Sequence, residues 1–393
     1  MATADVYKAG RLAGHLDRRP GGVQFRYAAD YLSDPGPAVA TTVPLTDEPL
    51  SGPGGAILPF LAGLLPEGRR LTNVRRAVKT SADDDLSLLL AVGADPVGDV
   101  QVVTAGDRPT AALPALVVDD PESLEFSLVL AESGIVDPVA LAGVQEKASA
   151  RTIAVPVSAG VGEHILKLSP PEYPHLVANE AVMLGIARRL RLPVVTTRLI
   201  TDRTGRQGLL VDRFDRVSAA DGSIRRLAVE DAGQLLGLYP ADKYNAGFEA
   251  VAQAVLSVCA ARPVAARNVL QQLTLAWLTG NGDLHAKNLS VVQADGEWRV
   301  SPLYDLPSTL PYGDTTMALS LAGRTSGLSR RKLLAFASGL GLPTRAAERA
   351  LDEVLAATGD LVPQLDAGVL PFGTQVIRSL HRVLTRRRRD LTA

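Results

Sequence analysis

Short alternating patterns of hydrophobic and polar residues mark the beginning of the chain. Val6-Tyr7-Lys8 and Gln24-Phe25-Arg26-Tyr27 alternate in the way that is typical of half-buried strands. Leu58 to Leu65 is predicted to be a short helix that ends before a proline, and residues 75–92, charged and then apolar, predict further helix. We therefore expect a separate small α/β subdomain over residues 1–108.

Strand patterns dominate residues 109–215, with one helix inserted. That helix is expected near Val177 to Leu192, where apolar residues recur on one side and a proline follows. The runs at 196–200 and 208–211 flank the turn residues Asp202-Arg203-Thr204-Gly205, so they should pair as a hairpin. Residues 216–393 are mostly helical, and the fold class predicted for the whole chain is α+β.

Composition and charge narrow the class of protein. The chain has 393 residues, 46% of them hydrophobic and 21% charged, which fits a globular protein of two or three domains. The net charge of −1 gives no general attraction to nucleic acid. Cys259 is the only cysteine, so an internal disulfide and a cysteine-rich zinc site are excluded. The start of the chain lacks a secretory signal pattern and no apolar run reaches membrane-spanning length, so we expect a cytoplasmic protein without membrane contact.

The candidate chemistry lies in the helical part of the chain. Asp283 and Asn288 have the D-x-x-x-x-N spacing of a protein-kinase catalytic loop. Strand-like runs at 289–293 and 298–302 predict a hairpin that brings Asp305 back beside Asn288. One carboxylate would deprotonate an attacking hydroxyl, while the amide and the second carboxylate hold Mg²⁺. Asp and Asn also favour loops for backbone reasons alone, so the pair by itself is more typical of an ordinary loop. With the hairpin and Asp305 added, a site and an ordinary loop fit the pattern about equally well.

A kinase also needs groups that bind the nucleotide upstream of this loop. Lys167 ends the apolar strand His164-Ile165-Leu166, and Glu180 follows at the start of the predicted helix, where it would orient the lysine. An exposed strand lysine, and an acidic residue that suits the helix dipole, are the structural alternatives. The polar segment Ala142-Gly143-Val144-Gln145-Glu146-Lys147 is a candidate phosphate loop, and Asp212-Arg213-Phe214 is a candidate hinge for the adenine or a plain strand end.

In their order along the chain, these motifs resemble those of a known family, the HipA toxin kinases of bacterial type II toxin–antitoxin modules. The matching segments are AGVQEK (142–147), HILKL (164–168), Asn179-Glu180, DRFDR (212–216), Glu230-Asp231 with Gln234, DLHAKN (283–288), Tyr304-Asp305, LLPEG (64–68) and PVGDV (96–100). The resemblance covers nearly the whole chain.

The resemblance implies a fold and an activity. The fold would be a bilobal core like that of the phosphatidylinositol kinases, with the N-lobe over 109–215 and a helical C-lobe over 216–393. The activity would be that of an ATP- and Mg²⁺-dependent serine/threonine protein kinase. The substrate that the resemblance implies is a translation factor, with an aminoacyl-tRNA synthetase as the first candidate, and the implied effect is growth arrest. The implied partner is HipB, a helix-turn-helix antitoxin, with operator DNA contacted only through that complex.

Residue roles also follow from the resemblance. Asp283 matches the catalytic base, and Asn288 and Asp305 match the Mg²⁺ ligands. The residues that would line the nucleotide site are Ala142, Gly143, Val144, Gln145, Glu146, Lys147, Lys167, Asp212, Arg213, Phe214, His285, Ala286, Lys287, Asn288, Tyr304 and Asp305. His285 is expected to fix the loop by a hydrogen bond or to transfer a proton, and Lys287 to contact a phosphate or face solvent.

The chain departs from the family pattern at two positions. Ala140 stands where the family has its autophosphorylated serine, so self-inactivation there is impossible, although Ser149 offers another hydroxyl. Asp212 stands where the family often has Glu. Two other functions remain open from the sequence, a small-molecule kinase of the same fold and a non-catalytic corepressor. The C-terminal run Arg386-Arg387-Arg388-Arg389 fits either a solvated helix end or a contact to operator DNA.

Overall fold

The computed structural model describes residues 4–81, 84–109, 120, 123–128, 152–159, 162–218 and 223–392. The candidate phosphate loop at 142–147, and with it Ala140 and Ser149, lies outside these residues. The described chain divides into two compact units. The first consists of residues 1–113, 215–243 and 290–296, and the second of residues 114–214, 244–289 and 297–393. The boundaries expected after residues 108 and 215 stay a prediction.

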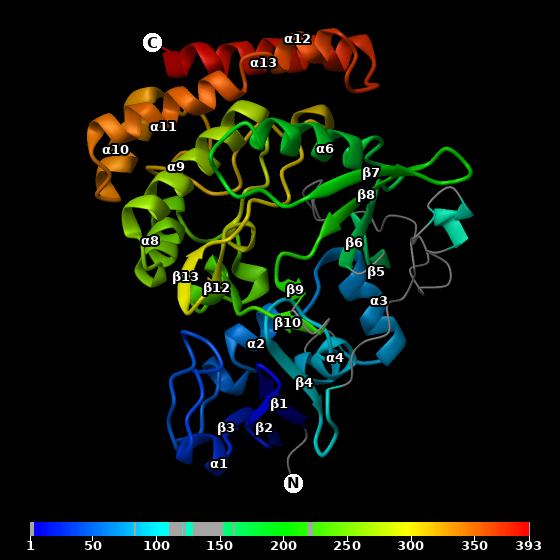
Figure 1. Cartoon of the computed structure of the whole chain (residues 1–393), viewed down its shortest axis with the longest axis vertical. Helices are drawn as coiled ribbons and strands as arrows, with labels where there is room; N and C mark the ends of the chain where they lie inside the picture. The colour runs from blue at the N-terminus through cyan, green and yellow to red at the C-terminus, as the bar shows by residue number, and fades with distance from the viewer. Residues whose placement is uncertain are drawn as a thin grey trace. The chain divides into compact units, whose positions relative to one another are not determined.

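A four-stranded antiparallel sheet forms the centre of the first unit (Figure 1). Its order is β3-β2-β1-β4, with strands β1 (Ala4–Lys8), β2 (Arg11–Arg19), β3 (Gly22–Tyr27) and β4 (Val100–Thr104). The helices of this segment are α1 (Ala29–Ser33), η1 (Pro53–Gly55), α2 (Pro59–Gly63), α3 (Gly68–Val78) and α4 (Asp85–Val92). Strands β1 and β3 and helix α2 were predicted from the sequence, and their buried side chains, such as Val6, Phe25 and Leu61, form one core cluster.

The helix predicted over 75–92 is present in part, because the chain forms two helices, α3 and α4, with a break between them. Lys79 ends α3 in the left-handed conformation with φ of 54°. The Asp84 side chain then accepts a hydrogen bond of 3.2 Å from the Ser87 N–H and caps the start of α4. A local cap therefore overrides the run of helix-favouring residues.

Later segments of the chain complete the first unit. They are β9 (Arg216–Ser218), β10 (Ile224–Arg226), β11 (Val229–Asp231), α7 (Ala232–Leu235), η4 (Pro240–Asp242) and β12 (Ser290–Ala294). Asp215 accepts a 2.9 Å hydrogen bond from the Gly98 N–H, and Arg216 donates to Asp95 at 2.7 Å. The buried Glu230 accepts from the N–H and hydroxyl of Thr41 at 2.8 and 2.6 Å. These motif residues hold the unit together.

A second four-stranded antiparallel sheet begins the second unit. Its order is β5-β6-β8-β7, with strands β5 (Ile153–Ala159), β6 (Gly162–Leu168), β7 (Thr197–Thr201) and β8 (Gln207–Asp212), and α6 (Leu176–Ala187) lies between β6 and β7 in the sequence. The predicted hairpin of β7 and β8 is confirmed, with Thr201 opposite Gln207. Helix α6 ends at Ala187, five residues before the predicted end at Leu192.

The helical part of the second unit surrounds one buried helix. Its elements are α8 (Phe248–Val258), α9 (Arg262–Thr279), η5 (Ala286–Asn288), β13 (Glu297–Val300), η6 (Leu310–Tyr312), α10 (Arg330–Gly339), α11 (Thr344–Ala357), α12 (Leu361–Asp366) and α13 (Thr374–Thr392). Figure 1 shows α9 among α8, α10 and α11. Gly280 ends α9 in the left-handed conformation, as glycine does at helix ends. None of the helices described is both long enough and apolar enough to cross a membrane.

The hairpin predicted beside the candidate site is confirmed. Strands β12 and β13 are neighbours in a sheet of order β11-β12-β13. Asp295 and Gly296 connect them with φ of 53° and 81°. Two consecutive positive φ values are the signature of a type I′ turn, which matches the twist of the strands that it joins. The turn fixes where the chain emerges from β13, and therefore where Asp305 can lie.

The C-terminal arginine run is not a uniformly solvated helix end, and this expectation is wrong for Arg387. Its side chain is 2% exposed and its guanidinium lies 3.8 Å from the ring centroid of Trp277. It donates hydrogen bonds to the carbonyls of Trp277 and Thr315 at 2.9 and 2.6 Å. Burial and the nearby Arg386 lower the pKa of Arg387 to about 10. Trp277 is in the core, as predicted, but its ring face carries a cation.

Replacing Arg387 by leucine should destabilise the protein. The buried Trp277 carbonyl and the Thr315 carbonyl lose their donor and the ring contact is lost, so we expect the free energy of unfolding to fall by about 3 kcal/mol in urea titrations. The matched control is Arg389→Leu on the exposed side of the same helix, with an expected change within about 0.5 kcal/mol. Equal losses in the two variants would contradict this role for Arg387.

Candidate active site

An ion-pair network around Lys167 joins three parts of the second unit. Lys167, near the end of β6, donates hydrogen bonds to Glu180 Oε1 at 2.8 Å and to Asp305 Oδ1 at 3.1 Å. Glu180 is 1% exposed on α6. It lies beyond the first turn of that helix, which begins at Leu176, so the helix dipole does not account for its position. The expected pair of Lys167 and Glu180 is present, and Asp305 completes it.

Asn288 and Asp305 lie directly beside each other. The Asn288 Nδ2 donates to Asp305 Oδ2 at 2.8 Å, and the Asn288 Oδ1 accepts from the His285 N–H at 3.1 Å. Asp305 has a φ of 54°, in the left-handed region that non-glycine residues rarely adopt. Such strain persists only where the surroundings enforce it, and it clusters at functional sites. Here the bonds from Lys167 and Asn288 supply that enforcement.

The charges of this network depend on one another. Burial lowers the pKa of the Lys167 ammonium, but Asp305 and Glu180 outweigh it, so the pKa is raised and the lysine stays charged. Burial raises the pKa of Asp305, yet the Lys167 charge outweighs burial and lowers it. For Glu180, burial dominates over Lys167 and its pKa is raised. Asp305 is therefore the carboxylate of this group that stays ionised most readily.

Asp283 is buried in a loop that several hydrogen bonds hold in place. Its N–H donates to Asn281 Oδ1 at 2.8 Å, and the Tyr244 hydroxyl donates to its Oδ1 at 3.2 Å. One residue earlier, the Gly282 N–H donates to Thr309 Oγ1 at 2.9 Å. Tyr244 was not predicted from the sequence, because no motif connects it with Asp283 and only the fold brings the two together.

The remaining loop residues connect Asn288 to an aromatic pair. His285 Nδ1 accepts from the Lys287 N–H at 3.2 Å, which is the loop-fixing bond expected of this histidine. The Lys287 carbonyl accepts from the Tyr304 hydroxyl at 2.7 Å. The Tyr304 ring is stacked with Phe214, with centroids 5.7 Å apart and planes inclined by 26°. Ala286 is fully buried in η5.

The candidate hinge already uses two of its N–H groups within the protein. The Asp212 N–H donates to the Thr196 carbonyl at 3.0 Å, and the Arg213 N–H donates to the Glu163 carbonyl at 3.1 Å. The Asp212 side chain bonds His164 Nδ1 at 2.8 Å. Contacts to a base from this segment therefore fall to Phe214 and to carbonyl groups.

A reciprocal pair of hydrogen bonds ties α6 to the segment after Asp305. Asn179 Nδ2 donates to the Ser308 carbonyl at 2.8 Å, and the Ser308 N–H donates to Asn179 Oδ1 at 3.0 Å. Asn179 is fully buried. Asn179 belongs to the family motif, but its role was not predicted, because a side chain that anchors the backbone of another segment has no sequence pattern of its own.

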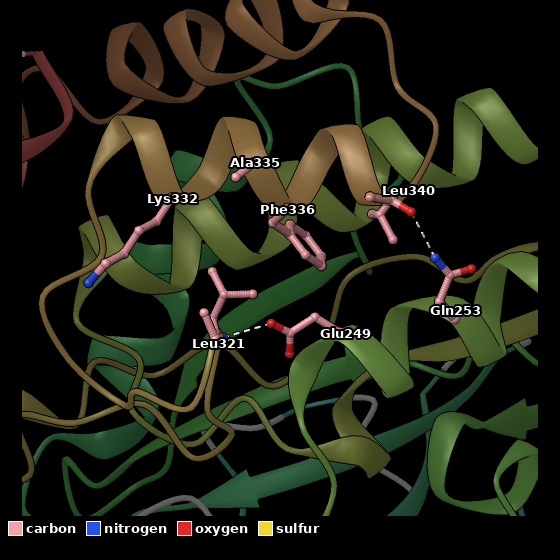
Figure 2. Close-up of a pocket in the computed structure, with 9 residues that line it drawn as sticks. Glu249, Gln253, Leu321, Lys332, Ala335, Phe336 and Leu340 are labelled. Atoms are coloured by element: carbon pink, nitrogen blue, oxygen red, sulfur yellow. Dashed lines mark hydrogen bonds between the residues drawn. The ribbon is translucent and has the colours of Figure 1, made fainter.

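A cavity of about 350 Å³ in the helical part contains none of the predicted site residues. Figure 2 shows that it lies between α8 and α10, with Glu249 and Gln253 at its edge. Glu249 accepts from the Ala322 N–H at 2.7 Å, and Gln253 donates to the Gly339 carbonyl at 3.1 Å. The side chains of Glu249 and Gln253 are thus hydrogen-bonded within the protein. We therefore place the candidate active site at Lys167, Asn288 and Asp305 and not at this cavity.

The amide and carboxylate groups of Asn288 and Asp305 are of the chemical type that binds a magnesium ion, and in this structure the Asn288 amide nitrogen, not its oxygen, faces Asp305. Amide and carboxylate oxygens are hard ligands, and Mg²⁺ is usually bound through one or two protein groups together with phosphates and water. The described residues contain no group of three His, Cys, Asp or Glu side chains that would hold a metal by themselves. In nucleotide-dependent kinases, phosphate oxygens complete the ligand set of such a metal.

Comparison with known families decides the relationship. A model described as "HipA-like C-terminal domain" matches residues 139–361, and one described as "HipA N-terminal domain" matches residues 4–103. The chain belongs to the HipA family. The α+β class and the resemblance predicted from the motifs are thereby confirmed, and the names of the relatives given below support a kinase.

Several relatives of this HipA-type chain are named as kinases. The chain is 30% identical to a protein of Sinorhizobium fredii named "Putative kinase Y4mE", over 86% of each chain. It is 28% identical to the serine/threonine-protein kinase toxin HipA of Shewanella oneidensis, over 91% of each chain. A solved complex of Shewanella oneidensis HipA, HipB and operator DNA has a similar fold, with a TM-score of 0.78, 22% identity and coverage of 99% of this chain and 97% of that one.

Replacing Lys167 by methionine should destabilise the HipA-type fold in a pH-dependent way. Two neighbouring carboxylates lose their cation, so we expect a loss of about 3 kcal/mol at pH 7 in urea unfolding. Glu180 then keeps its proton to higher pH in the folded than in the unfolded chain, so stability relative to wild type should recover as the pH falls from 7 toward 5.

The control for this prediction is Arg198→Met, which removes an exposed cation from β7 of the same sheet. It should change stability little at any pH in this range. A Lys167→Met loss that does not vary with pH would contradict the buried-carboxylate explanation.

Proposed function

We propose that the chain is an ATP- and Mg²⁺-dependent serine/threonine protein kinase of the HipA type. The observation that carries the proposal is the convergence of Lys167, Asn288 and Asp305, at hydrogen-bond distance, beside the loop that holds Asp283. A lysine with an acidic partner, an Asp–Asn metal pair and a base five residues before the asparagine are the parts that phosphoryl transfer requires.

Each group has one task in the proposed reaction. Lys167 neutralises charge on the α- and β-phosphates of ATP, while Glu180 fixes the direction of the lysine. Asn288 and Asp305 would hold Mg²⁺, which would supply positive charge to offset that of the phosphates. A substrate Ser or Thr oxygen forms the new bond to the γ-phosphorus, the bond from that phosphorus to the β,γ-bridging oxygen breaks, and ADP leaves.

Asp283 accepts the proton of the attacking hydroxyl. The Tyr244 hydroxyl, which donates to Asp283 Oδ1, fixes the rotamer of this base. Tyr304 and Phe214 offer a stacked aromatic surface near Lys287 for the nucleotide base. Residues 142–147 are proposed as the phosphate loop on their sequence alone.

The substrate and partner are proposed from the family. The name of the Shewanella oneidensis relative supports a protein substrate. From the family resemblance we propose a translation factor, with an aminoacyl-tRNA synthetase as the first candidate, growth arrest as the result and a cytoplasmic location. The Shewanella oneidensis complex contains HipB and operator DNA, which supports a HipB-like antitoxin as partner of this chain and DNA contact through it. Because Ala140 stands where the family has its autophosphorylated serine, we propose that the kinase activity of this chain is controlled by that partner.

Asp283→Asn should retain the fold and nucleotide binding but lose phosphoryl transfer. A positioned base contributes about 10²- to 10⁴-fold, so ³²P transfer to substrate protein should fall by at least ~100-fold. The matched control is Asp295→Asn in the exposed turn, where asparagine tolerates the positive φ. Transfer by Asp283→Asn at the rate of the control would remove Asp283 from the mechanism.

Asp305→Asn should weaken the binding of Mg-ATP. Asparagine keeps the left-handed backbone available but removes the charge that the metal needs, so we expect about a 10- to 100-fold higher dissociation constant in calorimetry. The loss should be smaller for ATP with EDTA, where no metal contributes. An unchanged affinity for Mg-ATP would show that Asp305 is not a metal ligand.

A further inference from the structure

A second cavity in the helical part of the second unit is lined by cations and hydroxyls. Its volume is about 340 Å³. The lining residues that matter are Arg382, Arg386, Arg387, Thr315, Thr316 and Ser326. The arginines come from two successive turns of α13, and the hydroxyls come from the segment between η6 and α10. None of these residues belongs to the candidate active site.

The three arginines carry charge that nothing nearby neutralises by direct contact. No Asp or Glu among the residues that the structure describes forms an ion pair with Arg382, Arg386 or Arg387. Asp314 attracts the Arg387 charge without forming an ion pair with it, and the repulsion between Arg386 and Arg387 is stronger than this attraction. Arginine clusters without carboxylate partners attract anions, since each guanidinium presents several N–H donors in a fixed plane.

The geometry of the cluster is partly preorganised. Arg387 is anchored by the Trp277 and Thr315 carbonyls and by the Trp277 ring, so its charge is held at the base of the cavity. Arg382 and Arg386 are exposed at the mouth and are free to turn toward a ligand. The fixed guanidinium of Arg387 and the two exposed guanidinium groups of Arg382 and Arg386 together suit a tetrahedral anion with several acceptor oxygens.

The hydroxyls complete the donor set. Thr315, Thr316 and Ser326 are exposed and line the cavity, and the Thr316 hydroxyl donates to Asp314 Oδ1 at 3.1 Å. Hydroxyl and guanidinium donors together are the groups that bind phosphate oxygens in proteins. We propose that this basic pocket binds a phosphate-type dianion, either inorganic phosphate or the phosphate group of a phosphorylated Ser or Thr side chain.

The pocket borders the loop that carries the candidate base. A Cβ atom added to Gly282 would lie 2.4 Å from the Thr316 carbonyl oxygen and 2.8 Å from Asp314 Oδ2, so the pocket segment packs closely on the residue before Asp283. An anion bound in the pocket would thus lie next to a segment that packs against the loop of Asp283. The binding inference itself does not require that the chain be a kinase.

The test is isothermal titration of the full chain with inorganic phosphate and with O-phospho-L-threonine at constant ionic strength. Each titration is run with and without Mg²⁺ and a non-hydrolysable ATP analogue, so binding at the proposed nucleotide site is recognised by its loss when the analogue is present. The variant is Arg382→Ala/Arg386→Ala, and the matched control is Arg378→Ala/Arg389→Ala, which removes two exposed arginines of the same helix outside the pocket.

We expect one analogue-insensitive site, with an affinity at least tenfold lower in Arg382→Ala/Arg386→Ala and within twofold of wild type in the control. Tighter binding of phosphothreonine than of phosphate would identify a phosphorylated side chain as the ligand, and the reverse order would identify the free ion. No analogue-insensitive binding of either probe, or equal affinities in wild type and Arg382→Ala/Arg386→Ala, would overturn the proposal.

Discussion

The contact of Lys167 with Glu180 and Asp305 is the interaction on which the site depends. One ammonium group compensates two carboxylates that burial would otherwise drive toward protonation. It also connects a strand, a helix and the segment after a hairpin, which are far apart in the sequence. The same contact that makes the arrangement stable keeps Asp305 ionised, and an ionised Asp305 is what a metal ion requires.

Local backbone constraints bring the other groups to this centre. Gly280 ends the buried helix α9, the capped turn η5 fixes Asn288, and the type I′ turn at 295–296 returns the chain. Each of these constraints acts over a few residues. Residues 283, 288 and 305 are therefore brought together without a long loop. Asn179 holds the segment after Asp305 in place, because its side chain bonds both the N–H and the carbonyl of Ser308.

Sequence reasoning succeeded where chemistry and local geometry are both short-range. The spacing of Asp283 and Asn288, and the turn residues before Asp305, predicted the neighbours observed here. The contact of Tyr244 with Asp283 and the anchoring role of Asn179 were not predicted, because these contacts exist only in the folded chain. The charged ends of β2 concealed that strand, and Arg387 in a polar run gave no sign of its burial against Trp277. The cap at Asp84 likewise divided a stretch that propensity favoured as one helix.

A crystal structure of the chain with Mg²⁺ and a non-hydrolysable ATP analogue tests the central claim most directly. The account predicts one Mg²⁺ about 2.0–2.1 Å from an oxygen of Asn288 and one of Asp305. It also predicts the Lys167 ammonium on the α- or β-phosphate, still paired with Glu180. A metal bound without either of these oxygens, or phosphates placed away from Lys167, would contradict it.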